Sequence, residues 1–594
     1  MKRLFHSLLL LLLLCAVSFA AAGEEEQFDV ELVVTATKIP QEITEAPGMV
    51  YTIDQEEIAA NQSKSVAEIL THEGFTISTH GGEHSLATIS LDGTSAVQNL
   101  IMIDGVPIHG GSTGNVDLSC FPLTGVETIE IVKGPLSALY GANALGGVVN
   151  IIPNLTGEPG AALTLSAGSF LSGRTNLTVS RENWGLALGG STTEGHLNHS
   201  ATNSYYFAAQ YNPIDTPDGF LKIYSSFRAK DAQIPGSHPG NQDDRNIFLS
   251  LTGKKELSHG YLQNKTSYQN WYNFYEDLSF LTKDQHKYQR FGTDLTYFYA
   301  TDNHRLLGGL SYNYDLSDST ATGSHRRHEI GFYLQDLWDL NDYLLLHSGV
   351  RMDKVDQYQT AFSPRLGLTW FIADHFNLGI NYGSAFRVPT INEYWYGNPE
   401  LKPEQGHKLE VTVHWKESRF SLRANLAHSQ LQNGIIWVDH DSDGFTDMPE
   451  NIEKLKTWGF SLEPQYNWGP VKTSLGYTYL DKRGWDPLTG DYDRNLNHFG
   501  QHQLNLKVQA KFGNLGITSG YRLVANRSKQ MDWNSGEEVS MPDYHLLSTA
   551  LDYQFNEHCT LDLALENLTG TKYEIHRGYP MPGRNFRLNL NIRY

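Results

Sequence analysis

The C-terminal segment of the chain, residues 586–594, alternates between apolar and polar side chains. Every second position is apolar: Phe586, Leu588, Leu590, Ile592 and Tyr594. The same period of two recurs at residues 409–415 and 504–512. In a β-strand, successive side chains point to opposite faces, so this period gives each strand one apolar and one polar face. The pattern therefore predicts a chain that is rich in two-faced strands.

The first 22 residues are typical of a secretory signal peptide. Lys2 and Arg3 supply a positive start, residues 8–14 form an unbroken run of leucine, and residues 20–22 are small alanines suited to cleavage. We therefore expect residues 1–22 to be removed when the protein is exported. The fold is expected to begin after them.

The remaining composition excludes several classes of protein. No later apolar run approaches the roughly 20 residues of a membrane helix. With 45 basic and 66 acidic residues, the net charge is −21, and nucleic-acid binders carry a basic face instead. The chain has three cysteines, too few for a disulfide-dense scaffold. Cys120 and Cys559, the two beyond the signal peptide, are predicted to be free thiols.

Alternation by itself does not say which face of a strand points inward. A secreted sandwich turns its apolar face to the core, whereas a membrane barrel turns that face to lipid. Three features favour the barrel. The segments match the about 9–11 residues of a tilted crossing. Tight turns such as residues 468–470 alternate with long polar loops such as residues 481–501. The polar faces also hold more Lys, Arg, Gln and Asn than a packed soluble core accepts.

We therefore expect residues 158–594 to form a transmembrane β-barrel in the outer membrane, in contact with lipid. A secreted all-β enzyme or lectin is the alternative. Residues 38–157 differ from this pattern, because helix-like (residues 65–70) and strand-like (residues 128–132) pieces mix with many glycines. This region is predicted to be a compact α+β domain.

The α+β domain resembles the plug of TonB-dependent outer-membrane receptors. The resemblance rests on residues 100–107, 126–135, 137–141 and 146–152, in that order. Barrel motifs at residues 385–389, 397–404, 566–568 and 578–584, and the terminal aromatic Tyr594, are similar to the same family. The resemblance implies a barrel of about 22 antiparallel strands with the N-terminal plug folded inside it.

Two plug positions depart from the family pattern. Lys133 stands where the family usually has arginine, and Asp92 stands where it has the arginine of an Arg-Gly pair. An arginine can pair bidentately with a wall carboxylate, whereas a lysine cannot and an aspartate reverses the charge. We therefore expect the ion pairs between plug and wall to be rearranged.

Residues 23–37 resemble the segment that carries the TonB box. The residues that match it are Asp29, Val30, Glu31, Leu32, Val33, Val34, Thr35 and Ala36. An exposed extended strand can add to the sheet edge of a partner. The resemblance implies that the partner is TonB, the energy-coupling protein of the inner membrane. An ordinary first strand of the plug is the alternative.

Two glycine-rich plug segments are predicted to face the substrate. Small residues let the backbone approach a bulky ligand closely. The segments consist of Gly81, Gly82, Glu83 and His84, and of His109, Gly110, Gly111, Ser112, Thr113, Gly114 and Asn115. The second runs into residues 116–122, and the whole stretch looks most like the cobalamin receptor branch. A ferric siderophore is the second expectation. Haem is the third, with His84 or His109 as the axial ligand.

An acidic segment fits the pattern of a calcium-binding loop, in which alternating oxygen ligands surround a glycine. The matching residues are Asp439, Asp441, Asp443, Asp447 and Glu450. Strand-like flanks exclude an EF-hand, and a polar outer loop is the alternative. Apart from this Ca²⁺, no cofactor is predicted.

The sequence does not predict an enzyme. Residues 110–114 match a nucleophile-elbow pattern, but they lack the strand–turn–helix context that it requires. A passive diffusion barrel is also disfavoured, because it needs neither a plug nor a TonB box. We expect a TonB-dependent transporter that imports a scarce, bulky nutrient, with cobalamin as the first expectation.

Overall fold

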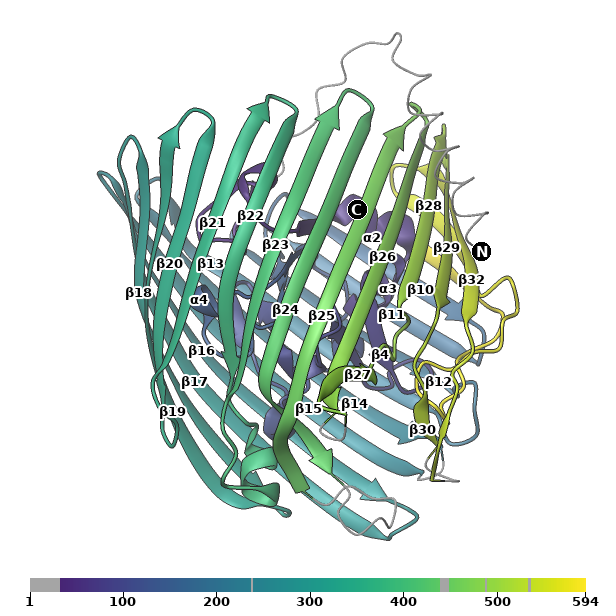
Figure 1. Cartoon of the computed structure of the whole chain (residues 1–594). Helices are drawn as coiled ribbons and strands as arrows, with labels where there is room; N and C mark the ends of the chain where they lie inside the picture. The colour runs from purple at the N-terminus through teal and green to yellow at the C-terminus, as the bar shows by residue number, and fades with distance from the viewer. Residues whose placement is uncertain (1–31, 237–238, 439–447, 487–488, 533–535) are drawn as a thin grey trace, which may run out of the picture.

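The computed structural model describes residues 32–236, 239–438, 448–486, 489–532 and 536–594. Its main body is a closed wall of 22 antiparallel strands. The first wall strand, β10, pairs with the last, β34, and this pairing closes the barrel. Figure 1 shows the tilted strands surrounding the N-terminal domain. The predicted plugged barrel is therefore confirmed.

The wall strands follow one another around the barrel in sequence order. Their bounds are β10 (Gly160–Gly168), β11 (Ser172–Ser180), β12 (Trp184–Thr193), β13 (Thr202–Thr216), β14 (Gly219–Ile234), β15 (Gly240–Leu257), β16 (Gly260–Asp277), β17 (Thr282–Ala300), β18 (His304–Ser319), β19 (Gly323–Asn341), β20 (Leu344–Val355), β21 (Ala361–Ala373), β22 (Phe376–Arg387), β23 (Glu404–Glu417), β24 (Phe420–Val438), β25 (Met448–Asn467), β26 (Val471–Asp486), β28 (His502–Phe512), β29 (Leu515–Ala525), β32 (Tyr544–Asn556), β33 (Cys559–Glu566) and β34 (Asn585–Arg593). Three short strands, β27 (Asp491–Asn495), β30 (Gln530–Asp532) and β31 (Glu537–Val539), lie in the connections.

The apolar face of the wall points outward. In β34, Phe586 is 51% exposed and Leu588 43% exposed, whereas Arg587 and Asn589 between them are both 7% exposed. In β23, Leu409 is exposed and its neighbour Glu410 is buried against the lumen. A sandwich would bury the apolar set, so this arrangement excludes a sandwich and matches a barrel in lipid.

Two details of the wall differ from the sequence prediction. Several strands are longer than a membrane crossing needs, and β25 has 20 residues. Hairpin pairing continues past the bilayer because each added residue pair extends the same ladder. For the same reason, the predicted polar loop at residues 481–501 is shorter than expected, since β26 continues to Asp486 and β27 pairs with it.

The two ends of the barrel are unlike. Tight turns such as residues 217–218, 258–259 and 468–470 lie at one end, which we call the turn end. Long connections such as residues 388–403 and 567–584 lie at the other, which we call the loop end. In Figure 1 the turn end is at the top, where the C-terminus is marked. In membrane barrels, long loops face outward and short turns face the periplasm.

The plug is built on a five-stranded sheet in the order β3-β8-β9-β6-β7, to which two two-stranded sheets (β1-β2 and β4-β5) and three short α-helices are added. Its elements are β1 (Leu32–Val33), β2 (Gln41–Glu42), η1 (Ile43–Glu45), β3 (Val50–Ile53), α2 (Gln55–Asn61), α3 (Val66–His72), β4 (Thr76–Thr79), β5 (Ala87–Ser90), η2 (Ala96–Gln98), β6 (Asn99–Ile103), β7 (Val106–Ile108), η3 (Gly111–Thr113), η4 (Leu118–Cys120), β8 (Val126–Lys133), α4 (Ser137–Tyr140) and β9 (Gly147–Pro153). The wall begins at Gly160, shortly after β9 ends.

Local sequence explains the plug elements. Ser65 caps α3, because its side chain accepts a hydrogen bond from the backbone N–H of Glu68. Ile129 and Ile131 of β8 pack with Val66 and Ile69 of α3 in one apolar core. The predicted helix and strand are thus both confirmed. No helix in the described part of the chain is long and apolar enough to cross a membrane. Cys120 and Cys559 are free, as predicted.

The two departures from the family pattern meet in one ion-pair group. Asp92 lies 3.6 Å from the ammonium of Lys133 and 2.8 Å from that of Lys408 on the wall. Lys408 also pairs with Glu410 at 2.9 Å. A wall cation therefore meets a plug anion, which is the rearrangement expected from the sequence.

Candidate substrate and coupling sites

The plug loop at residues 109–115 lines a cavity of about 330 Å³ between the plug and the wall. The wall contributes residues from β14 to β17 to this cavity. We call it the outer cavity, because it includes Asp284 and Tyr275 near the loop-end tips of β17 and β16. The structure thus places the second predicted substrate segment beside open space between plug and wall.

The glycines of this loop are needed for its shape. A Cβ on Gly110 would lie 1.8 Å from the carbonyl oxygen of Asn115, and one on Gly111 would lie 2.2 Å from the ring of Trp271. Gly111 also has φ +65°, which favours glycine. Gly110, Gly111 and Ser112 are buried, whereas Thr113 at the tip is exposed. Gly110 therefore lets the loop fold tightly on itself, Gly111 lets it pack against Trp271 of the wall, and the exposed Thr113 lines the cavity.

The lining of the outer cavity is rich in amides and rings. Its amide side chains are Asn115, Gln242, Asn246, Gln269, Asn270 and Asn273. Its six-membered and indole rings are Phe121, Phe248, Trp271, Tyr275 and Tyr288. Among the described residues that line it, three carboxylates (Asp117, Asp244 and Asp284) stand against one arginine, Arg228. Such a surface offers many hydrogen bonds and no excess of positive charge.

Two of these carboxylates share a wall cation. The ammonium of Lys230 lies 2.6 Å from Asp117 of the plug and 3.4 Å from Asp244 of the wall. Asp117 also accepts the backbone N–H of Ala87 at 3.0 Å. Lys230 is 3% exposed. This buried group fixes the plug to the wall beside the cavity.

His109 lies between the loop and the wall. Its backbone N–H donates to Gln269 Oε1 at 3.2 Å, and its ring stacks on Tyr288 with centroids 4.9 Å apart. Burial lowers the pKa of His109 to about 3, so the ring is neutral near pH 7.

The first predicted segment, residues 81–84, lines a different cavity of about 310 Å³, which we call the side cavity. Glu83 pairs with Lys64 at 2.8 Å and with Arg174 of the wall at 2.9 Å. Burial alone would raise the pKa of Glu83, but Lys64, His84 and Arg174 hold it well below its usual value. The carboxylate is therefore committed to holding the plug to the wall.

His84 is similarly engaged. Its Nε2 lies 2.8 Å from the hydroxyl of Ser191 on the wall, and it is 8% exposed. Burial lowers the pKa of His84 to about 4. The structure thus separates the two predicted substrate segments into two cavities, with Asp117 and Lys230 between them.

The predicted TonB box is described only in part. Asp29, Val30 and Glu31 lie outside the described residues, and β1 pairs with β2. The carboxylate of Glu130 accepts the backbone N–H groups of Val34 at 3.2 Å and Thr35 at 2.8 Å. Val33, Thr35 and Ala36 are buried, whereas Val34 is exposed. The described part of the segment is therefore packed against the plug, with Leu32–Val33 as a short first strand and residues 34–36 in a turn.

Further contacts hold the same segment. The hydroxyl of Tyr140 donates to the carbonyl of Thr35 at 3.0 Å, and the amide of Asn150 donates to its hydroxyl at 3.0 Å. Arg365 of the wall donates to the carbonyl of Ala36 at 2.9 Å. A partner that pairs with residues 29–36 as an added strand must first break these bonds.

Sequence reasoning missed Glu130 as a functional residue. It is 3% exposed and lies between two buried isoleucines of β8. A carboxylate within a buried strand needs a hydrogen-bond or ion-pair partner, so the position of Glu130 between two isoleucines could have pointed to it in the sequence. Nothing comparable marks Gln269 or Trp271, because lumen-facing amides and rings occur along the whole wall.

Most of the predicted calcium ligands lie in a part of the chain that the structure does not describe. Asp439, Asp441, Asp443 and Asp447 lie outside the described residues. Glu450 lies in β25, opposite Ile436 of β24. The calcium site therefore stays a prediction.

Comparison with known proteins gives the family. The family profile described as TonB dependent receptor-like, beta-barrel matches residues 160–568, and the TonB-dependent Receptor Plug Domain matches residues 42–148. Among curated relatives, the vitamin B12 transporter BtuB of Photobacterium profundum is 28% identical, and that of Vibrio cholerae serotype O1 is 23% identical; each alignment covers 98% of both chains.

Solved structures share the architecture. The ferripyoverdine receptor of the outer membrane of Pseudomonas aeruginosa has a TM-score of 0.79 at 16% identity, covering 95% of this chain and 89% of that one. At this identity the likeness concerns the fold alone. A closed 22-stranded wall, a plug inside it and two family profiles that together span most of the chain lead to one conclusion: the chain belongs to the TonB-dependent receptor family.

Proposed function

We propose that this protein binds cobalamin at the loop end of the barrel and imports it across the outer membrane with energy from TonB. The main observation in favour of cobalamin as the substrate is the lining of the outer cavity. This lining combines amides and aromatic rings with more carboxylates than cations. Similarity over nearly the full length to two vitamin B12 transporters supports the same choice.

The charge of the lining discriminates among the candidate ligands. The rim of a corrin carries amides, which can exchange hydrogen bonds with Asn and Gln side chains. Ferric siderophores and the propionates of haem bring negative charge, whereas Asp117, Asp244 and Asp284 outnumber the two nearby cations, Arg228 and the Lys230 that pairs with the first two. The lining of the outer cavity therefore supports cobalamin over these anionic ligands.

The predicted coupling segment suits this function. Ligand binding at the loop end must change the equilibrium of a segment on the periplasmic side, which is coupling between two sites. Arg365 of the wall donates to the carbonyl of Ala36, so a shift of the plug against the wall would alter this bond. We infer that residues 29–36 detach from this position and pair with TonB as an added strand.

A binding screen tests the substrate. Calorimetry on the purified full-length protein with cyanocobalamin, ferripyoverdine and haem is expected to give tight binding for cobalamin alone. Tight binding of an iron chelate, together with no heat from cobalamin, would show that the substrate assignment is wrong. The proposed transporter function would be unaffected.

A Thr113→Trp variant is expected to weaken cobalamin binding at least a hundredfold, or about 2.7 kcal/mol. Thr113 is the exposed tip of the loop, so a large ring there occupies the opening without disturbing the wall. Thr113→Ser serves as the control and should bind as the parent does. Gly111→Trp is a poorer probe, because its side chain would first displace Trp271.

The acidic loop gives a separate prediction. We propose that Asp439, Asp441 and Asp443 bind Ca²⁺ and tighten substrate binding. In the parent protein, removing Ca²⁺ with a chelator should then lower cobalamin affinity, and a variant with Asp439→Asn and Asp441→Asn should show the low affinity under both conditions. Equal affinity of the parent with Ca²⁺ and with chelator would show that the loop is merely solvated.

A further inference from the structure

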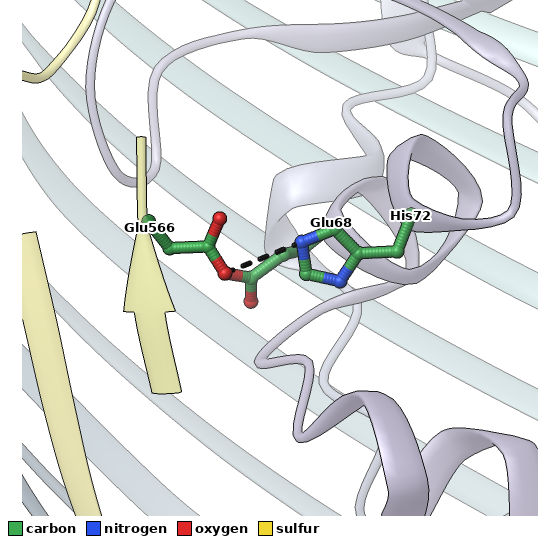
Figure 2. A group of neighbouring side chains, drawn as sticks. All are labelled: Glu68, His72 and Glu566. Carbon is green, nitrogen blue, oxygen red and sulfur yellow. Dashed lines mark ion pairs between the residues drawn. The ribbon is translucent and has the colours of Figure 1, made fainter. Parts of the chain in front are cut away.

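Three potential metal ligands meet where helix α3 of the plug faces the wall. Glu68 and His72 are four residues apart on α3 and therefore share one face of the helix. Glu566 is the last residue of β33. Figure 2 shows its carboxylate directed toward the His72 imidazole and the Glu68 carboxylate. The three ligand atoms lie within 4.8 Å of one another.

We propose that Glu68, His72 and Glu566 bind a first-row divalent metal ion, such as Zn²⁺, that links the plug to the wall. An imidazole with two carboxylates is a common donor set for Zn²⁺. The His72 Nε2 atom lies 3.4 Å from Glu566 Oε1. Metal–ligand bonds of about 2.1 Å in a tetrahedral site place two ligand atoms about 3.4 Å apart. The distance between His72 Nε2 and Glu566 Oε1 therefore already matches such a site.

The other ring nitrogen of His72 is oriented as in known metal sites. His72 Nδ1 lies 3.0 Å from the hydroxyl of Ser63. When Nδ1 donates its proton to an oxygen, Nε2 presents its lone pair, which is the usual arrangement around a ligating histidine. In this tautomer three electron-rich atoms converge, and a cation between them relieves their repulsion.

Space and charge at the cluster also suit an ion. All three residues line the side cavity, which has room for a fourth ligand such as water. The guanidinium of Arg587 lies 3.5 Å from Glu68 and offsets part of its charge, whereas the ion pair of Glu566 is with His72. Burial alone would lower the pKa of His72, but Glu566 raises it to about 9, so a proton competes with the metal near pH 7.

The metal would join two parts of the protein that are distant in sequence. His72 and Glu68 belong to the plug, and Glu566 belongs to the wall. An ion held by all three restrains α3 against β33, and we expect it to slow local opening of that helix. This consequence is separate from the proposed transport of cobalamin, because it is measured without substrate.

The test is metal binding to the full-length mature protein, purified without a polyhistidine tag and kept in excess Ca²⁺ so that the acidic loop does not compete. Zn²⁺ titration by calorimetry at pH 8 should show one more bound equivalent in the parent than in His72→Gln or Glu566→Gln. Co²⁺ should give the visible absorption of a tetrahedral site in the parent and lose it in both variants. His558→Gln, an exposed histidine beside Glu557, is the control and should behave as the parent.

A second readout separates a metal link from a general loss of structure. Zn²⁺ should increase hydrogen-exchange protection of the α3 amides in the parent and in His558→Gln, and not in the two cluster variants. If His72→Gln does not assemble, Glu566→Gln provides the same comparison from the wall side. Equal Zn²⁺ stoichiometry in the parent and the cluster variants, or no Co²⁺ absorption in the parent, would overturn the proposal and show that the cluster is an ion pair of protonated His72 with Glu566.

Discussion

A Leu32→Pro variant is expected to bind substrate as the parent does and to transport none. Proline has no backbone N–H and cannot complete the ladder of a strand added to a partner. Leu32 pairs with Glu42 in β1–β2, far in sequence from both cavity-lining loops, so the substrate site is left intact. Uptake of labelled cobalamin by cells, together with calorimetry on the purified variant, measures the two effects separately.

The control for this variant is Leu32→Ala, which shortens the side chain and keeps the N–H donor. It should retain most of the uptake. Uptake by the proline variant at the parental rate would show that residues 29–36 are no more than the first strand of the plug.

An Arg387→Met variant is expected to destabilise the loop end of the barrel by about 3–5 kcal/mol. Arg387 is 1% exposed and lies 2.8 Å from Glu393 and 2.6 Å from Glu404. Glu404 also accepts a hydrogen bond from Gln98 of the plug at 2.9 Å. Removing the guanidinium leaves two buried carboxylates without their cation, and the plug contact is weakened with them.

Urea unfolding of the protein in detergent, followed by tryptophan fluorescence, measures this loss. The matched control is Arg245→Met, which breaks an exposed, solvent-screened ion pair with Asp243 on the same wall and should leave the unfolding midpoint nearly unchanged. Adding Glu393→Gln and Glu404→Gln to Arg387→Met should recover part of the stability. Similar unfolding midpoints for the two single variants would contradict the role given to the buried group.

The sequence was sufficient for the elements and for the family. Alternation in residues 586–594 predicted a two-faced strand, and β34 has that pattern. Residues 65–70 were predicted to be helix-like, and α3 forms there with Ser65 as its cap. These are local properties, because a strand's period and a helix's cap depend on residues a few positions apart. The plug and barrel motifs added the architecture.

The direction of the strand faces was decided only by closure of the barrel. Alternation is the same whether Phe586 or Arg587 points inward, and the lumen becomes polar only once β34 pairs with β10. The reason for the glycine at residue 111 also came from packing, because Trp271 is distant in sequence and sets the space beside it.

Three features share one physical cause. They are the separation of the two predicted substrate segments, the bonds of Glu130 with Val34 and Thr35, and the meeting of His72 with Glu566. Each depends on contacts between residues distant in sequence: each cavity is lined by a plug loop and by wall strands, Glu130 meets a residue about a hundred positions away within the plug, and His72 meets Glu566 across the boundary between plug and wall. Sequence determined which strands and helices this protein forms and which family it belongs to. Only the docking of the plug in the closed wall decided which of its charges and rings face one another.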